Sequence, residues 1–69
     1  GMIDRAAEKQ RLMEEREITE AMIAQLDARL RDNAFLTRAP QHIVEKERQK
    51  LRPLKDKLEG LKFELSQLD

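Results

Sequence analysis

Cysteine, tyrosine and tryptophan are absent from this 69-residue sequence, and phenylalanine occurs only twice. Without cysteine the chain can form neither disulfides nor thiolate zinc sites, and the single His42 cannot build a metal site alone. No apolar run approaches the roughly 20 residues of a membrane span, and no hydrophobic region of a signal peptide is visible. We therefore expect no metal cofactor, no membrane partner and a cytoplasmic location, with His42 solvated at the surface.

Glycine and proline are scarce, with two of each in the chain. Neither occurs between residues 3 and 32, which favours one continuous helix there. Helical periodicity stops only in the middle, at 33–40, and a break this short returns the second helix antiparallel to the first. The sequence therefore predicts an all-α fold, an antiparallel two-helix coiled-coil hairpin in one domain. We expect helices over residues 3–33 and 40–69 and a tip over 34–39.

Two residues at the start and one in the second helix call for separate interpretation. Gly1 ahead of Met2 resembles the residue that tag cleavage leaves, so we interpret residues 1–2 as such a remnant and the start of the chain. Pro53 removes one backbone hydrogen bond from the second helix, at a cost of about 3 kcal/mol. We expect the leucines on both sides to carry the helix through Pro53, with a bend there.

Charged residues are abundant, at 41% of the chain against 39% hydrophobic residues, a mixture typical of coiled coils. The formal net charge is zero, which argues against a binder that holds polyanions by bulk charge. Charge is unevenly distributed, however. Between residues 38 and 57, seven basic residues stand against three acidic ones, so the tip side of the second helix is predicted to be basic.

Apolar residues recur at heptad spacing in both arms, which predicts two seams that pack on each other. The second-arm seam consists of Val44, Glu47, Leu51, Leu54, Leu58, Leu61, Leu65 and Leu68. The first-arm seam consists of Leu12, Arg16, Thr19, Ile23, Leu26 and Leu30. Antiparallel matching sets Leu26 opposite Leu51 and Leu12 opposite Leu65.

The first-arm seam is weak where Arg16 and Thr19 occupy its core positions. We expect a local stutter that rotates the helix and presents Ile18 and Met22 instead. Phe63 lies outside the second seam and is predicted to be exposed.

The same register distributes charge differently on the two flanks of the hairpin. One flank brings opposite charges together, Asp27 beside Arg48 and Glu20 beside Lys55. On the other flank three cations are predicted to have no acidic partner and to be free to meet an anion: Arg29, Lys50 and Lys57.

Three residues are expected to organise the tip. Asn33 tolerates the left-handed conformation that ends a helix, so it is predicted to cap the first helix. Pro40 is suited to the start of the second helix, where its missing N–H is not needed. Glu47 is a carboxylate at a core position and needs partners, which we expect to be backbone N–H groups of the tip or Arg38. Phe35 is expected to plug the end of the seam.

The stretch from Asn33 to Leu51 reads NAFLTRAPQHIVEKERQKL. It resembles the tip signature of the C-terminal tRNA-binding arm of valyl-tRNA synthetase. In that family an asparagine and a phenylalanine precede an alanine-proline pair, and valine, glutamate and arginine follow on the second helix. The resemblance covers the whole chain as a hairpin, although the flanking leucine heptads fit many coiled coils. Pro53 departs from the alanine-rich and charged sequence usual in the family.

The resemblance implies an appendage of a class I aminoacyl-tRNA synthetase that contacts the outer corner of the L-shaped tRNA. Its partners would be valine tRNA and the remainder of the parent synthetase. The chain has no glycine-rich phosphate loop and no cluster of histidine and carboxylates, so we expect no catalytic residue and no cofactor in it. ATP would belong to the parent enzyme. Candidate tRNA-binding residues are Arg29, Phe35, Arg38, Lys46, Lys50, Arg52 and Lys57.

Two other functions compete with the tRNA arm. A structural module could pair with another chain through exposed apolar residues such as Ile18, Met22 and Phe63, and the isolated hairpin could self-associate in the same way. A DNA-binding hairpin of an ABC-type ATPase would need a broadly basic surface, which a net charge of zero does not favour.

Overall fold

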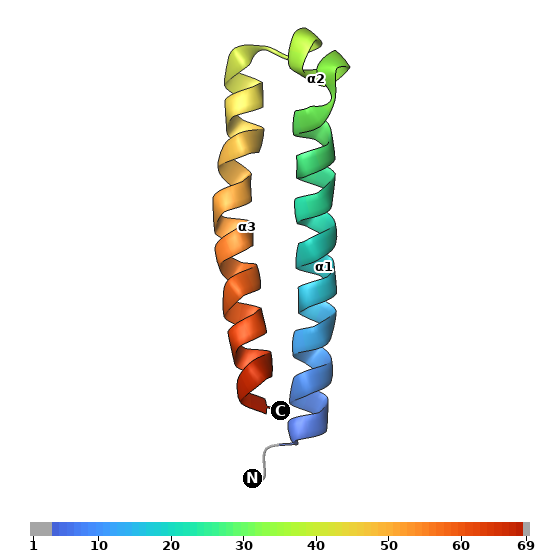
Figure 1. Cartoon of the computed structure of the whole chain (residues 1–69), viewed down its shortest axis with the longest axis vertical. Coiled ribbons are helices and arrows are strands. Elements are labelled where there is room, and N and C mark those ends of the chain that lie inside the picture. The colour runs from blue at the N-terminus through green and yellow to red at the C-terminus, as the bar shows by residue number, and fades with distance from the viewer. Residues whose placement is uncertain (1–3, 69) are drawn as a thin grey trace.

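The computed structural model describes residues 4–68 of the chain. It contains helix α1 (Arg5–Arg31), the short helix α2 (Asn33–Arg38) and helix α3 (Gln41–Leu68). α1 and α3 lie side by side and run in opposite directions, and α2 joins them at one end of a rod of 53 × 18 × 15 Å (Figure 1). No strand occurs among the described residues. The predicted all-α hairpin is thus confirmed, and residues 1–2, interpreted as a tag remnant, lie outside the described part.

Two aspartates determine where the first helix begins and ends. The carboxylate of Asp4 accepts hydrogen bonds from the backbone N–H groups of Ala6 (3.1 Å) and Ala7 (3.2 Å), and so it satisfies two donors of the first turn. At the other end, Asp32 adopts an extended conformation, and its N–H donates to the carbonyl of Arg29 at 3.2 Å. Its carboxylate accepts from the N–H of Ala34 at 3.0 Å, so Asp32 ends α1 and caps α2 at once.

Because Asp32 ends one helix and caps the next, the tip differs from the prediction made from the sequence. We expected helix 1 to continue to Asn33 and end there in a left-handed conformation. The helix instead ends at Arg31, Asn33 is the first residue of α2, and no residue between 4 and 68 has a positive φ. Because the Asp32 carboxylate accepts from the N–H group of Ala34, the chain re-enters a helix after one extended residue. The segment that we expected to be a simple connection is therefore mostly one short helix.

The second long helix begins at Gln41, one residue after the predicted start at Pro40, and it passes Pro53 without interruption. The carbonyl of Pro40 accepts hydrogen bonds from the N–H groups of Ile43 (3.0 Å) and Val44 (3.1 Å). Pro53 lies on the exposed side, as does Gln49, whose carbonyl loses its helical donor to the proline. Water can reach that carbonyl, which limits the cost of proline inside the helix.

The buried apolar residues are concentrated at the end of the rod away from α2. Leu12, Leu61 and Leu65 form one cluster there with relative exposures of 2%, 5% and 7%, and Leu68 packs against it. Because Leu12 and Leu65 belong to the same cluster, the packing agrees with the register that sets them opposite each other.

The predicted stutter of helix 1 is wrong. Thr19 is 1% exposed and remains in the seam, whereas Ile18 and Met22 are 61% and 47% exposed. The Thr19 hydroxyl donates to the carbonyl of Glu15 at 2.8 Å, so burying this side chain leaves no donor without a partner. The helix therefore has no reason to rotate. Phe63, at 65% exposure, lies outside the seam as predicted.

Two further findings concern a membrane span and a metal site, neither of which the sequence predicts. Within residues 4–68, no helix is both long and apolar enough to cross a membrane. The same part of the chain contains no group of three or more histidine or acidic side chains that could hold a metal ion, and His42 is exposed.

Candidate nucleic-acid interface

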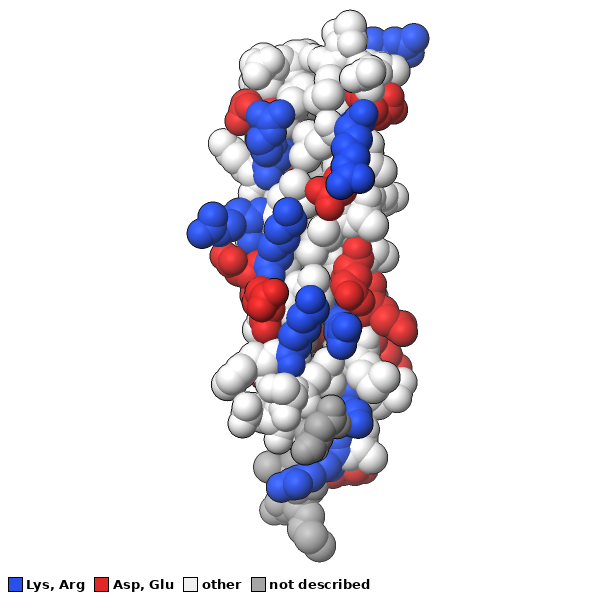
Figure 2. Space-filling model, viewed as in Figure 1, with Lys and Arg blue, Asp and Glu red and all other residues white. Residues whose placement is uncertain are grey.

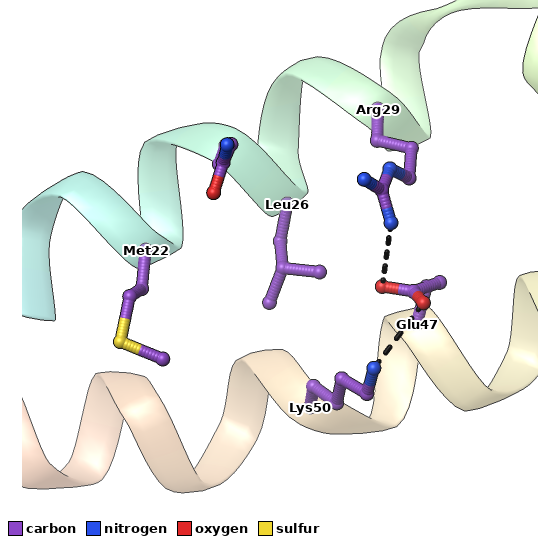
Figure 3. Close-up of a pocket in the computed structure, with 6 residues that line it drawn as sticks. Met22, Leu26, Arg29, Glu47 and Lys50 are labelled. Atoms are coloured by element: carbon purple, nitrogen blue, oxygen red, sulfur yellow. Dashed lines mark hydrogen bonds and ion pairs between the residues drawn. The ribbon is translucent and has the colours of Figure 1, made fainter.

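The acidic residue Glu47 lies buried between the two long helices, near the tip (Figure 3). Its Oε1 accepts a hydrogen bond from Lys50 Nζ at 3.2 Å, and its Oε2 lies 3.5 Å from Arg29 Nη1. Oε2 is fully buried and receives no hydrogen bond, so the contact with Arg29 is an ion pair without hydrogen-bond geometry. Glu47 thus holds one cation of its own helix and one of α1.

These partners differ from the ones expected for Glu47, which were tip N–H groups or Arg38. The reason is distance along the helix. Glu47 comes six residues after Gln41, where α3 begins, and at 1.5 Å per residue this places it roughly 9 Å below the tip. Arg29 on the facing helix is within reach at that level, and Lys50 is one helical turn further along α3.

Arg29 also connects this ion-pair cluster to the tip helix. Its guanidinium carbon lies 5.7 Å from the centroid of the Phe35 ring, within the range of a cation–π interaction. Phe35 is half-buried on α2. A continuous series of contacts therefore runs from Lys50 through Glu47 and Arg29 to Phe35. We call these four residues the tip cluster.

The prediction that Arg29 and Lys50 have no acidic partner is therefore wrong. Both pair with Glu47, because a carboxylate at the seam position lies between the two flanking cations. Lys57 is different: within residues 4–68 its exposed side chain forms no ion pair. Of the three cations expected to be free, Lys57 alone is free in the described part of the chain.

On the opposite flank, the two predicted ion pairs across the helices are not formed. Each pair loses one member to a neighbour within the same helix, since residues three or four apart lie on one helical face. The pairs that form instead are Glu45 with Arg48 at 2.5 Å and Glu20 with Arg16 at 3.7 Å.

The remaining candidate cations are accessible but differ in their partners. Arg38, in the last turn of α2, and Lys46, in the second turn of α3, are exposed and form no ion pair within residues 4–68. Arg52 lies 3.6 Å from Asp56, but both side chains are strongly exposed, at 86% and 70%. Such a pair is weak and screened by salt, so Arg52 remains available to an anion.

Figure 2 shows how charge is distributed over one face of the rod. Basic side chains occur along the middle of this face, and acidic side chains lie among them on both long helices, most densely at mid-height on the α1 side. Both signs are interspersed, in keeping with the formal net charge of zero. A ligand that needs a continuous positive surface would not find one on this face.

A shallow groove of about 200 Å³ lies beside the buried carboxylate (Figure 3). Apolar and polar side chains line it together, as in many sites that bind small groups. The lining residues are Met22, Gln25, Leu26, Arg29, Glu47 and Lys50. Sequence reasoning missed this groove, although a signal for it existed: an acidic seam residue with a cation three positions later and another on the facing arm.

The fold and the site define a class of protein, the antiparallel helical hairpin with a charged and structured tip. Comparison with known proteins then identifies the family. Residues 4–69 match the family model described as the valyl tRNA synthetase tRNA binding arm. The match extends over almost the whole chain, so this chain belongs to that family.

Several curated relatives are whole valine–tRNA ligases. The ligase of Chromobacterium violaceum is 39% identical over 66 residues, which cover 96% of this chain and 7% of the ligase. The ligase of Dehalococcoides mccartyi is 44% identical over 61 residues, 88% of this chain and 7% of the ligase. The ligase of Christiangramia forsetii is 35% identical over 68 residues, 99% of this chain and 8% of the ligase. The chain thus spans less than a tenth of these relatives, and no solved structure matches it.

Proposed function

We propose that this hairpin is the tRNA-binding arm of a valine–tRNA ligase and that it contacts the outer corner of the L-shaped valine tRNA. The observation that carries the proposal is the family match over residues 4–69. The arm assists aminoacylation, and the activation of valine by ATP belongs to the remainder of the synthetase.

The accessible cations support a contact with the tRNA backbone. Arg38 and Lys46 lie at or near the tip, and Lys57 lies further along α3, all without ion-pair partners within residues 4–68. Contacts to phosphate and sugar position a protein on a nucleic acid. Phe35 with Arg29 supplies a partly exposed aromatic and cationic surface near the tip.

Few phosphate contacts imply weak binding by the isolated hairpin. We expect a Kd of about 10⁻⁴ to 10⁻⁶ M at physiological salt, the range of non-specific electrostatic binding. In the whole synthetase the arm is tethered beside a docked tRNA, which raises its effective concentration. The contribution of the arm therefore appears mainly in the tRNA affinity of the parent enzyme.

A fluorescence titration of the 69-residue chain tests the proposal. The ligands are valine tRNA, a second tRNA and a duplex DNA, each measured over a series of salt concentrations. We expect tRNA to bind more tightly than duplex DNA. Equal or tighter binding of duplex DNA would favour the DNA-binding alternative, and no RNA binding at all would reject the tRNA arm.

Substitution of single cations locates the contact. Lys46→Gln and Lys57→Gln should each shallow the log–log salt dependence by about 0.7 to 0.9 if each lysine contacts one phosphate. Lys62→Gln is the matched control, because Lys62 is exposed, forms no ion pair within residues 4–68 and lies far from the tip. An equal effect of Lys62→Gln would mean that bulk charge and not a located contact holds the RNA.

Deletion of the hairpin from the parent synthetase tests its role in aminoacylation. We expect the KM for tRNA to rise while pyrophosphate exchange with valine and ATP is spared, because the proposed role concerns tRNA alone. Equal losses in both assays would identify the hairpin as a folding or assembly element.

Self-association is a second candidate role that one observation favours. Ile18 and Phe63 are 61% and 65% exposed, more than any other large apolar residue within residues 4–68. Sedimentation of the chain over a range of concentrations measures whether copies associate. A monomer at all concentrations would remove this role.

A further inference from the structure

Glu47 occupies a seam position that the heptad pattern otherwise gives mostly to leucine in α3. Its side chain is 12% exposed, whereas its partners Arg29 and Lys50 are 49% and 59% exposed. Replacing a buried ion pair by an apolar residue is often neutral or stabilising, so stability alone does not account for a carboxylate here.

The geometry of the tip cluster indicates what the carboxylate does. The Glu47 carboxylate lies between two cations, and each of its oxygens contacts a different one, Arg29 or Lys50. The carboxylate therefore offsets part of the positive charge of Arg29 and Lys50 and restrains their side chains. Arg29, held on one side by Glu47, lies with its guanidinium near the Phe35 ring on the other.

Restraint matters because an unpaired arginine or lysine binds the phosphates of any nucleic acid. Specificity is a difference between two affinities, and it rises when binding to the wrong partner is weakened. A guanidinium whose position is set before binding favours a ligand of matching shape over a flexible chain of phosphates.

We propose that Glu47 is a positioning and specificity-determining residue, which restrains Arg29 and Lys50 so that the tip cluster discriminates folded RNA from other polyanions. The proposal rests on the proposed tRNA-binding function and assigns to Glu47 no contact with RNA. Its chemical basis is the sharing of one buried carboxylate between two partly exposed cations.

The test compares variants of the 69-residue chain in binding to a folded tRNA and to a single-stranded RNA of the same length, over a salt series. Glu47→Gln removes the charge and keeps the shape. We expect it to bind the single strand more tightly, to steepen the salt dependence by up to about 0.7 to 0.9 for each released cation, and to lower the ratio of tRNA to single-strand affinity several-fold.

Glu45→Gln is the matched control. It changes the net charge equally on the same helix, but Glu45 is more exposed, at 43%, and pairs with Arg48 outside the tip cluster. We expect the affinity ratio of this variant to equal that of the wild type. If Glu45→Gln and Glu47→Gln lower the ratio equally, the effect is bulk charge and the proposal is overturned.

A second variant separates positioning from charge and from folding. Glu47→Asp keeps the negative charge but withdraws the carboxylate by one methylene group, so it should lower the ratio while net charge is unchanged. Circular dichroism establishes which variants keep their helical content. A folded Glu47→Asp or Glu47→Gln variant with the wild-type ratio overturns the proposal. Failure of the tRNA-binding function itself is seen separately, as a wild-type chain that binds no RNA.

Discussion

The two ends of the hairpin use the same heptad seam for different purposes. At the end away from α2, Leu12, Leu61 and Leu65 form a buried apolar cluster. At the tip end the corresponding layer contains Glu47 between two cations, and its only fully apolar buried residue among those described is Val44. We call these the base layer and the tip layer.

The difference indicates a division of roles along the rod. Apolar burial contributes roughly 25 cal/mol per Å², so each buried leucine of the base layer contributes more than a half-buried leucine in the middle of the rod. The tip layer instead arranges charge around a short helix that carries Phe35 and Arg38. Between the two, Leu51 and Leu54 are only half-buried, as expected for a rod in which each helix has one neighbour.

The largest expected effect comes from breaking the base layer. Leu61→Ala should lower the free energy of unfolding by about 2 to 5 kcal/mol, because Leu61 is 5% exposed and its removal leaves a cavity between Leu12 and Leu65. Leu51→Ala, in the half-buried middle, should cost less. Thermal and urea melts followed by circular dichroism measure both, and equal costs would contradict the division.

Replacing Glu47 by leucine tests whether the charged tip layer contributes to stability. Glu47→Leu should leave the stability unchanged or raise it by about 1 to 4 kcal/mol, since leucine extends the apolar seam and both former partners are exposed enough to be solvated. The same melts measure this change. A clear loss of stability would mean that the ion pairs, and not only apolar contacts, hold the tip end together.

The start of the tip helix depends on one side chain. Asp32→Ala should cost about 1 kcal/mol, because it removes the acceptor for the Ala34 N–H group at the start of α2. Hydrogen exchange of the tip amides should accelerate with it. Asp27→Ala is the control, since Asp27 caps no helix in the described structure, and it should leave the exchange of the tip unchanged.

The smallest expected effect is a gain in stability near the base layer. Gly60 lies on the exposed side of α3, and a Cβ atom added there meets nothing within 4 Å. Gly60→Ala should therefore raise the free energy of unfolding by about 0.5 to 1 kcal/mol through helix propensity alone. Ala24→Gly, at an exposed site in α1, should lower it by a similar amount. A destabilising Gly60→Ala would mean that the glycine has a packing role.

Much of the fold followed from the sequence alone. Two long segments with apolar heptads and a short break between them indicate an antiparallel hairpin, because each helix must bury its stripe on the other. Pro40 before the second helix was recognisable as a helix start, because it acts within one turn of its own position. Local interactions of this kind depend on residues whose spacing is visible in the sequence.

What tertiary structure decided is the choice among competing partners. The packing of α1 on α3 buries Thr19 and leaves Ile18 and Met22 exposed. Arg29 and Lys50 pair with Glu47, whereas Lys57 is left without an ion pair within residues 4–68. The physical reason is that long charged side chains reach several partners, and exposed pairs differ by less than about 1 kcal/mol. Which pair forms then depends on small differences in the placement of the side chains. The periodicity of the sequence does not determine that placement.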